Sequence, residues 1–291
     1  MILCGTCAWS DHQHFYPKSV RAGDKLAYYA RHFSVVEVDS TFYALPKPTV
    51  TARWAAQTPE GFVFDVKANR MMTLHDRSLP NIAEKLPVFR AFDELLQPIR
   101  EKGRLRALLF QFPPWFAKTQ SHQHYVEACR LAYEQDMVAV EFRHNSWFQE
   151  SEKDQTIEWL QALQAIHVVA DEPQVGESCI PLVPFVTDAR LAILRLHGRN
   201  AETWMQPGLT SSGERFRYLY KDKEIEELFN VAKLLHKNAE VVHILMNNNY
   251  DNFAIRGAFM MQRLVKPEKP ERLTDDTNIW FSEQQAWKFD E

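Results

Sequence analysis

The chain has 291 residues, 45% of them apolar and 25% charged, and a formal net charge of −4. This composition is typical of a globular protein and excludes a disordered or fibrous chain, while the slight acidic excess argues against nucleic-acid binding by bulk charge. No apolar run reaches the roughly 18 residues that a membrane span requires, so no membrane association is expected. The first residues lack the basic and apolar regions of a signal peptide, and the four cysteines are scattered. Both features indicate a cytoplasmic protein with reduced thiols.

Two of the cysteines, Cys4 and Cys7, have the C-x-x-C spacing that occurs in zinc and redox sites. A zinc site would need a second such pair, and a redox motif would open a helix after a strand. Cys4 is instead expected inside the first strand. We therefore expect neither role for this pair.

Short β-branched or apolar runs alternate with amphipathic stretches along almost the whole chain. In chain order, the expected strands cover residues 2–5, 35–39, 62–67, 105–112, 137–143, 167–171, 191–197 and 241–246. The expected helices cover residues 24–32, 48–57, 87–102, 122–134, 153–165, 223–237 and 252–264. Eight strands, each followed by a helix or by a segment long enough for one, predict an α/β fold of the (β/α)8 TIM-barrel type. An open doubly wound sheet is the alternative, but it would need a glycine-rich phosphate loop, which the sequence lacks.

The chain shows no linker or composition break, which indicates a single domain. We expect residues 1–266 to form the barrel and the polar tail 267–291 to pack on it. The longest irregular stretches, 172–188 and 198–217, directly follow strands. Loops in that position form the catalytic rim of a barrel, so these two are expected to be lids or binding loops.

Charged residues share one face within several expected strands, close to the carboxyl end of each strand. They are Glu37 and Asp39, Asp65 and Lys67, Glu141 and Arg143, and Arg195 and His197, with Gln111 and Asp171 expected at equivalent places. Side chains alternate between the two faces of a strand, and the apolar face of a barrel strand lies under the helices. The charged face therefore points to the barrel axis, near the mouth where active sites of such barrels lie. The alternative is a purely structural network, with pairs such as Glu141 and Arg195; a functional pocket is favoured because several buried charges are costly.

Short motifs follow the expected strands along nearly the whole chain. They are GTCAW at 5–9, FYP at 15–17, EVDSTFY at 37–43, QFPP at 111–114, EFRHNSW at 141–147, ADEP at 170–173, RLHGR at 195–199, RYLY at 217–220 and NNN at 247–249. In these motifs the chain resembles the domain-of-unknown-function family 72, also called YecE-like. The resemblance implies a TIM barrel with enzymatic character, distantly similar to the sugar-isomerase and endonuclease barrels, but implies no particular reaction. Two residues depart from the family pattern: Asp39 replaces the usual Asn, and Ala8 replaces the usual Gly.

The residue types at the predicted mouth suit acid/base chemistry on an anionic, hydroxyl-bearing molecule. The catalytic candidates are Glu141, His197, Asp171 and Glu37, and the candidates for anion binding are Lys67, Arg143, Arg195 and Arg199. His197 is the foremost acid/base candidate because imidazole titrates near neutrality, although a structural histidine is an equal alternative. The candidates for stacking or polar contact with the substrate are Trp9, Tyr43, Gln111, Trp147, Asn247 and Asn249.

No cofactor is firmly implied by the sequence. A divalent metal is the alternative, with Glu37, Glu141, Asp171 and His197 as its ligands. The neighbouring arginine and lysine charges would repel a cation, so the preferred prediction has no metal.

The sequence therefore predicts an enzyme that acts on a phosphorylated or polyhydroxylated small molecule, such as a sugar phosphate or nucleotide, by acid/base isomerisation or hydrolysis. One alternative is a metal-dependent phosphodiesterase or nuclease, which would make nucleic acid a partner. Another is a metabolite-binding barrel without turnover. The sequence leaves open the substrate, the reaction and the oligomeric state.

Overall fold

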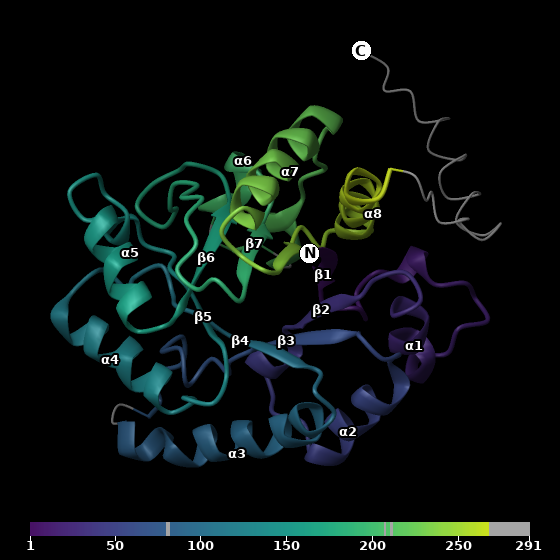
Figure 1. Ribbon diagram of the computed structural model, residues 1–291, viewed down its shortest axis with the longest axis horizontal. Helices are drawn as coiled ribbons and strands as arrows, with labels where there is room; N and C mark the ends of the chain where they lie inside the picture. Colours follow the sequence, from purple (N-terminus) through teal and green to yellow (C-terminus); the bar gives the residue numbers. More distant parts are fainter. Residues whose placement is uncertain (80–81, 207, 210–211, 268–291) are drawn as a thin grey trace.

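The computed structural model describes residues 1–79, 82–206, 208–209 and 212–267 (Figure 1). Its strands are β1 (Ile2–Cys7), β2 (Val35–Val38), β3 (Val63–Lys67), β4 (Leu105–Gln111), β5 (Val138–Glu141), β6 (Ile166–Asp171), β7 (Ala192–Leu196) and β8 (Val242–Met246). Its α-helices are α1 (Lys25–Tyr29), α2 (Pro48–Gln57), α3 (Ile82–Glu101), α4 (Gln120–Leu131), α5 (Lys153–Ala162), α6 (Ala201–Trp204), α7 (Asp222–His236) and α8 (Phe253–Val265). Short 3-10 helices are η1 (Gln13–Phe15), η2 (Ala22–Asp24), η3 (Ser40–Phe42), η4 (Asn145–Trp147) and η5 (Ser212–Phe216).

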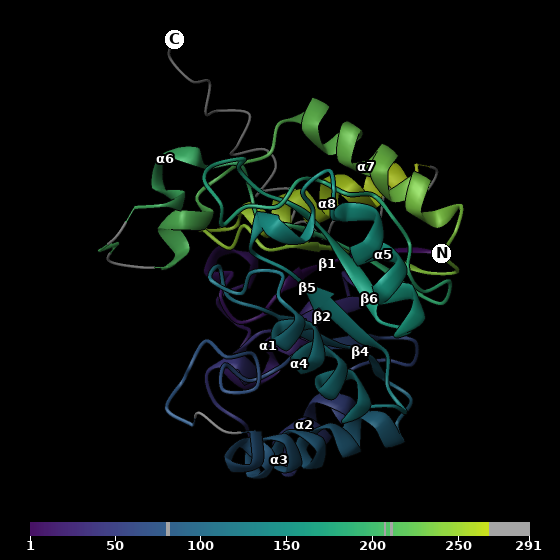
Figure 2. The same cartoon turned by 90° about the vertical axis from the view of Figure 1, so that its left-hand side faces the viewer.

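The eight strands are parallel and form a closed barrel in the order β1 to β8. Closure comes from pairing of β8 with β1, where Val242 lies beside Ile2. Helices α2 and α3 flank one side of the barrel, and α7 and α8 flank the opposite side (Figures 1 and 2). The predicted (β/α)8 barrel is thus confirmed, and all eight expected strands are present.

One expected helix begins earlier than predicted, and of the two stretches expected to be irregular, 172–188 contains no described helix, whereas 198–217 contains α6. Helix α3 begins at Ile82, whereas the sequence predicts its start at residue 87, and the helix accommodates Pro87 as its sixth residue at the loss of one intrahelical hydrogen bond. No helix separates β6 from β7 among the described residues, whereas both α6 and α7 follow β7. Helix α6 lies apart from the ring of larger helices (Figure 2).

The structure bears on three further expectations, which concern membrane-spanning helices, the cysteine thiols and the packing of the tail. No helix in the described part of the chain is long and apolar enough to cross a membrane. All four cysteines are buried free thiols, and burial raises the pKa of Cys4 to about 12. The predicted packing of the tail falls on residues that lie outside the described part, apart from Pro267.

The barrel interior is apolar at its base and polar toward the carboxyl ends of the strands. The apolar base is a cluster of buried side chains that includes Val35, Leu109, Ala139, Val168, Ile193 and Leu245. The opposite strand faces belong to the larger core beneath the helices. A buried hydrogen bond between two polar side chains also lies within the barrel, where His243 Nδ1 is 2.6 Å from Asp65 Oδ2. The predicted alternation is therefore present, and the polar layer lies above an apolar base.

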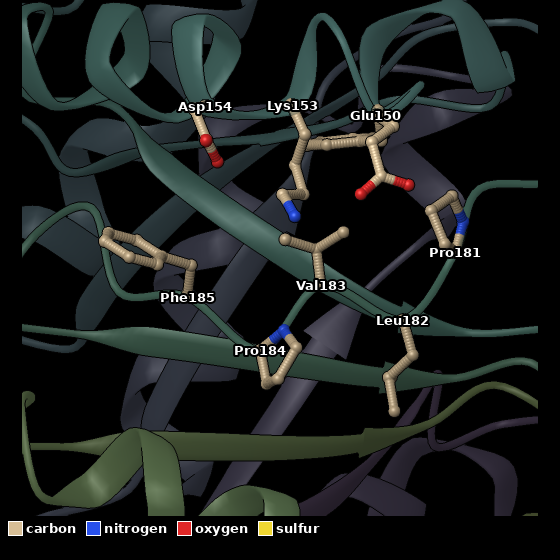
Figure 3. Close-up of a pocket in the computed structure, with 9 residues that line it drawn as sticks. Glu150, Lys153, Asp154, Pro181, Leu182, Val183, Pro184 and Phe185 are labelled. Carbon is tan, nitrogen blue, oxygen red and sulfur yellow. The ribbon is translucent and has the colours of Figure 1, made fainter.

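The connection from β6 to β7 covers the barrel flank where a helix would otherwise pack. His167 points outward from β6 and its Nε2 is 3.1 Å from the carbonyl oxygen of Val183, so this nitrogen carries the proton. The ring of Phe148 lies 4.9 Å from that of His167. Outside these residues is a flank pocket of about 470 Å³, in which Lys153 and Asp154 point toward Val183 and Pro184 (Figure 3). This pocket belongs to the side of the barrel and not to its mouth.

The close approach of β1 to β2 requires glycine at position 5. A Cβ atom at Gly5 would lie 2.1 Å from the carbonyl oxygen of Val35, and backbone cannot yield as a flexible side chain can. We expect Gly5→Ala to lower the free energy of unfolding by about 3 kcal/mol, the upper range for overpacking. Gly23→Ala is the control, because nothing lies within 4 Å of its added carbon. Urea denaturation of both variants tests this, and equal midpoints would contradict the close approach.

Burial of His167 predicts a loss of stability in acid. Burial lowers the pKa of His167 from 6.5 to about 4. Between these values the unfolded chain binds a proton that the folded chain does not, so this contribution is complete above pH 6.5 and disappears as pH falls toward 4. At about 1.4 kcal/mol per pKa unit it is on the order of 3 kcal/mol. Urea midpoints measured from pH 7 to 4.5 should fall less in His167→Gln than in the wild type or in the control His124→Gln, which changes an exposed ring. Parallel curves for all three proteins would refute the assignment.

Candidate active site at the barrel mouth

Arg195 is the centre of a fully buried charge cluster inside the barrel. Its Nε and Nη2 donate to the two carboxylate oxygens of Glu37 at 2.8 and 2.7 Å, and its Nη1 donates to Glu141. All three side chains have no solvent-exposed surface. Burial alone would lower the pKa of Arg195, but Glu141 and Glu37 hold it well above its ordinary value. The guanidinium group is therefore permanently charged and already occupied by carboxylates.

Glu141 links this cluster to His197. Its Oε1 accepts a hydrogen bond from Gln111 at 2.6 Å and lies 3.0 Å from Nε2 of His197. Burial opposes ionisation, yet Arg195 and His197 hold the pKa of Glu141 well below its ordinary range. The carboxylate is thus ionised and has hydrogen-bond partners on both oxygens.

His197 is a neutral, positioned ring. Asn247 Nδ2 lies 2.7 Å from its Nδ1, and an amide nitrogen can only donate, so Nδ1 accepts and Nε2 carries the proton toward Glu141. Burial lowers the pKa of His197 to about 4, despite the opposing charge of Glu141. Because the ring is fully buried and both nitrogens are engaged, His197 is placed to orient Glu141 and not to meet a substrate directly.

Above this cluster, Lys67 and Asp39 lie half-buried at neighbouring strand ends. The register pairs Val38 with Val66, so the residues that follow them are adjacent across β2 and β3. Lys67 Nζ donates to Gln111 Oε1 at 2.8 Å and lies 4.6 Å from the centre of the Phe42 ring. Burial, followed by the charge of Arg195, lowers the pKa of Lys67, whereas burial raises that of Asp39 to about 6. Neither group forms an ion pair within the described part of the chain.

Arg143 also lies at the mouth, where it is paired with Glu172, a residue outside the predicted set of candidates. Its Nε is 3.0 Å from Glu172 Oε2, and its guanidinium group lies 4.9 Å from the ring centre of Trp204. Burial raises the pKa of Glu172 to about 7, opposed by Arg143. A second residue outside that set is His75, whose pKa is lowered to about 4 by burial and by the charges of Lys67 and Arg143. Glu172 could have been found by extending the alternation of the buried strand by one residue; His75 lies in a loop and has no such signal.

Asp171 and Arg199 do not belong to the axial cluster, in contrast to the prediction. Ala170 pairs with the inward-facing Arg195, so the next residue of β6 faces outward. There Arg199 donates to both oxygens of Asp171 at 2.8 to 3.1 Å, and Tyr220 donates at 2.6 Å. Arg199 also pairs with Glu224 of α7 at 3.2 Å. The alternation is the same as in the other strands, but the inward face of β6 carries Glu172 in place of Asp171.

The predicted stacking and polar residues occupy different environments. Trp147 is fully buried, 3.8 Å from the Phe142 ring in a stacked arrangement beneath the helices, and has no face free for a ligand. Trp9 packs edge-on against Trp54 at 5.3 Å, while Tyr43 is 64% exposed. The remaining three are tied into the rim: Gln111 and Asn247 join the network above, and Asn249 donates to the carbonyl oxygen of Cys7 at 2.6 Å.

The four residues named as alternative metal ligands do not converge. Both oxygens of Glu37 are bound by Arg195, and both oxygens of Asp171 are bound by Arg199 on the other side of the strand. Among the described residues, no group of three or more His, Cys, Asp or Glu side chains is arranged to hold a metal ion. The donor set thus does not fit a metal centre.

Removal of Arg195 should leave the buried carboxylates of Glu37 and Glu141 without the guanidinium group that lies between them. We expect Arg195→Met to lower the free energy of unfolding by about 3–5 kcal/mol. Adding Glu37→Gln should recover part of this loss, so that the double variant is more stable than Arg195→Met alone. The control is Arg190→Met, since Arg190 is 54% exposed in its pair with Asp188 and should cost less than about 1 kcal/mol. Chemical denaturation measures all of these variants, and equal losses from the two arginines would overturn the buried-cluster account.

Comparison with known proteins places the chain among relatives of the same fold. The sequence profile of the family described as "Protein of unknown function DUF72" matches residues 3–278. The UPF0759 protein YunF of Bacillus subtilis (strain 168) is 36% identical over 270 residues, which cover 92% of this chain and 96% of that protein. The crystal structure of a DUF72 family protein from Enterococcus faecalis V583 superposes with a TM-score of 0.84 at 29% identity, covering 91% of this chain and 95% of the other. A D-psicose 3-epimerase from Clostridium cellulolyticum H10, solved with D-tagatose, has a TM-score of 0.50 at 11% identity over 97% and 98% of the two chains, a likeness of fold alone.

Proposed function

The chain belongs to the DUF72 family, as its motifs indicated, and we propose that it is an enzyme that isomerises a polyhydroxylated small molecule by acid/base chemistry at the barrel mouth. Asp39 is the group that exchanges protons with the substrate, and Lys67 is the cationic or amine group opposite it. Glu37, Glu141, Arg195 and His197 form the buried support beneath them.

The observation that carries this proposal is the pair of shifted titrations at adjacent strand ends. The pKa of Asp39 is raised to about 6, and that of Lys67 is lowered. A carboxyl group whose pKa is close to neutrality can both take and return a proton during one turnover, which an ordinary aspartate does poorly. Strongly shifted pKa values cluster at functional sites, where burial and neighbouring charges adjust a group to its chemical task.

The charge balance favours a hydroxylated substrate over a phosphorylated one. Arg195 is held by Glu37 and Glu141, and Arg143 by Glu172. A phosphate would have to compete with these carboxylates for the arginines, whereas sugar hydroxyl groups can join amide and ammonium groups by hydrogen bonds. The fold is shared with an epimerase whose structure contains the ketose D-tagatose, which supports this substrate class by analogy of fold only.

The test is a screen of unphosphorylated and phosphorylated aldoses and ketoses, by thermal shift for binding and by NMR for conversion. A sugar that binds should raise the melting temperature with its concentration, and one that reacts should yield an isomer. We expect Asp39→Asn to lower kcat by about 10²- to 10⁴-fold. We also expect the wild-type kcat/KM to rise with pH through about 6, as Asp39 loses its proton. The control is Glu101→Gln, which removes an exposed carboxylate at the end of α3, next to the start of β4.

The other outcomes separate the alternatives. Saturable binding without conversion would favour a metabolite-binding barrel, and full activity of Asp39→Asn would remove Asp39 from the mechanism. Activity on oligonucleotides that a chelator abolishes would replace this proposal with the metal-dependent phosphodiesterase.

A further inference from the structure

We propose that Lys67 is a nucleophile that forms an imine with the carbonyl carbon of an open-chain aldehyde or ketone. This assignment rests on the function proposed above and names the reactive form of its substrate as a hydroxycarbonyl compound.

The first ground is that Lys67 differs from the other cations on the inward faces of the strands. Arg143 and Arg195 both form ion pairs with carboxylates. Lys67 is the cation of these three that forms no ion pair within the described chain, and its Nζ meets only a neutral acceptor, Oε1 of Gln111 at 2.8 Å. A half-buried structural lysine inside a barrel would be expected to hold a carboxylate, because removing an unpaired ammonium group from water is costly.

The second ground is the chemistry of its surroundings. The Phe42 ring covers the Nζ atom at 4.6 Å, and the charge of Arg195 acts from below. Burial and the positive charge of Arg195 favour the neutral amine, which is the nucleophilic form. The carboxylates of Glu37, Asp39 and Glu141 oppose this shift, but the pKa of Lys67 is lowered on balance. The contact with Gln111 accepts one N–H and leaves the nitrogen free to rotate its lone pair toward a bound carbonyl group.

The third ground is the neighbouring carboxyl group, which can complete the reaction. The Asp39 carboxylate first takes one proton from the Lys67 ammonium group. Attack by the Nζ lone pair then forms the C–N bond, and the carbonyl oxygen receives one proton from the nitrogen and a second from Asp39. Water then leaves, giving a protonated imine and an ionised Asp39 carboxylate. That carboxylate removes the proton on the adjacent carbon to give an enamine. Return of the proton to the opposite face of that same carbon, followed by addition of water to the imine, releases the epimer and restores the Lys67 ammonium group and the Asp39 carboxylate. The sequence consumes no oxidant, reductant or cofactor.

The experiment traps the imine in the full-length protein with dihydroxyacetone or D-glyceraldehyde and sodium borohydride, followed by peptide mass mapping. We expect one reduced triose on Lys67, and labelling that persists at pH 7, because the neutral fraction of an amine rises about tenfold for each unit by which its pKa is lowered. Lys25 is the matched internal control, since its Nζ also meets an oxygen, that of Ser10 at 3.0 Å, and an aromatic ring, Tyr16 at 4.8 Å.

Variants separate this inference from the proposed function. Lys67→Arg should abolish the label and turnover, whereas Lys25→Arg should retain both; melting temperatures check that each variant is folded. Equal labelling of Lys67 and Lys25 in the wild type would overturn the inference without any variant. Sugar isomerisation that survives in Lys67→Arg would reject the imine and keep the proposed function. A specific adduct on Lys67 with no isomerisation of any sugar would retain the imine and reject the isomerase.

Discussion

The ion cluster of Arg195 with Glu37 and Glu141 is the constraint on which the upper half of the barrel depends. Three charges without solvent contact are tolerated only if their hydrogen bonds are nearly complete, because desolvation of each ion costs several kcal/mol. The cluster meets this condition by joining strands that are far apart in sequence, β2, β5 and β7. It also carries one negative charge in excess. The positive charges of Arg143 and Lys67, which lie above the cluster, offset that excess. Arg143 interacts with Glu141, and Lys67 interacts with both Glu37 and Glu141.

The cluster divides the polar residues into a closed layer and an open one. In the closed layer every group is engaged: Glu141 receives bonds from Arg195, Gln111 and His197, and the ring of His197 is fixed by Asn247. A rigid, preorganised set of charges and hydrogen bonds of this kind suits catalysis, because none of these groups needs to reorient during a reaction. In the open layer, Lys67 and Asp39 are half-buried and lack ion-pair partners in the described chain. We therefore assign the reaction with the substrate to Lys67 and Asp39 in the open layer, and the orientation of these groups to the closed layer.

The irregular connection after β6 follows from a polar residue on an outward strand face. His167 lies where other strands place an apolar side chain beneath a helix, and its ring donates to the carbonyl oxygen of Val183. A packed helix has few free carbonyl groups along its length, because its own N–H groups occupy them. An irregular segment offers such a free carbonyl acceptor. The irregular connection at this flank therefore satisfies the hydrogen bond of His167, which a packed helix would leave unmade. The flank pocket borders the same segment.

The sequence alone determined the barrel, since eight short apolar runs and the stretches between them follow from the local periodicities of strand and helix. It also placed Glu37, Glu141, Arg195 and His197 on the axis, because alternation within a strand is a local property. The prediction for β6 assigned the inward face to the wrong residue: Asp171 faces outward, and Glu172 lies on the inward face. Only the tertiary structure decided which charges neutralise each other. Arg195 and Arg199 stand in the same sequence motif, but Arg195 is paired with two axial carboxylates, whereas Arg199 forms an ion pair with Glu224 of α7. The tertiary structure alone shows that His197 is held between Glu141 and Asn247 and is not a free acid or base. It also shows that Lys67 has no ion-pair partner among the described residues. Pairing and burial depend on residues far apart in the chain, and no local pattern encodes them.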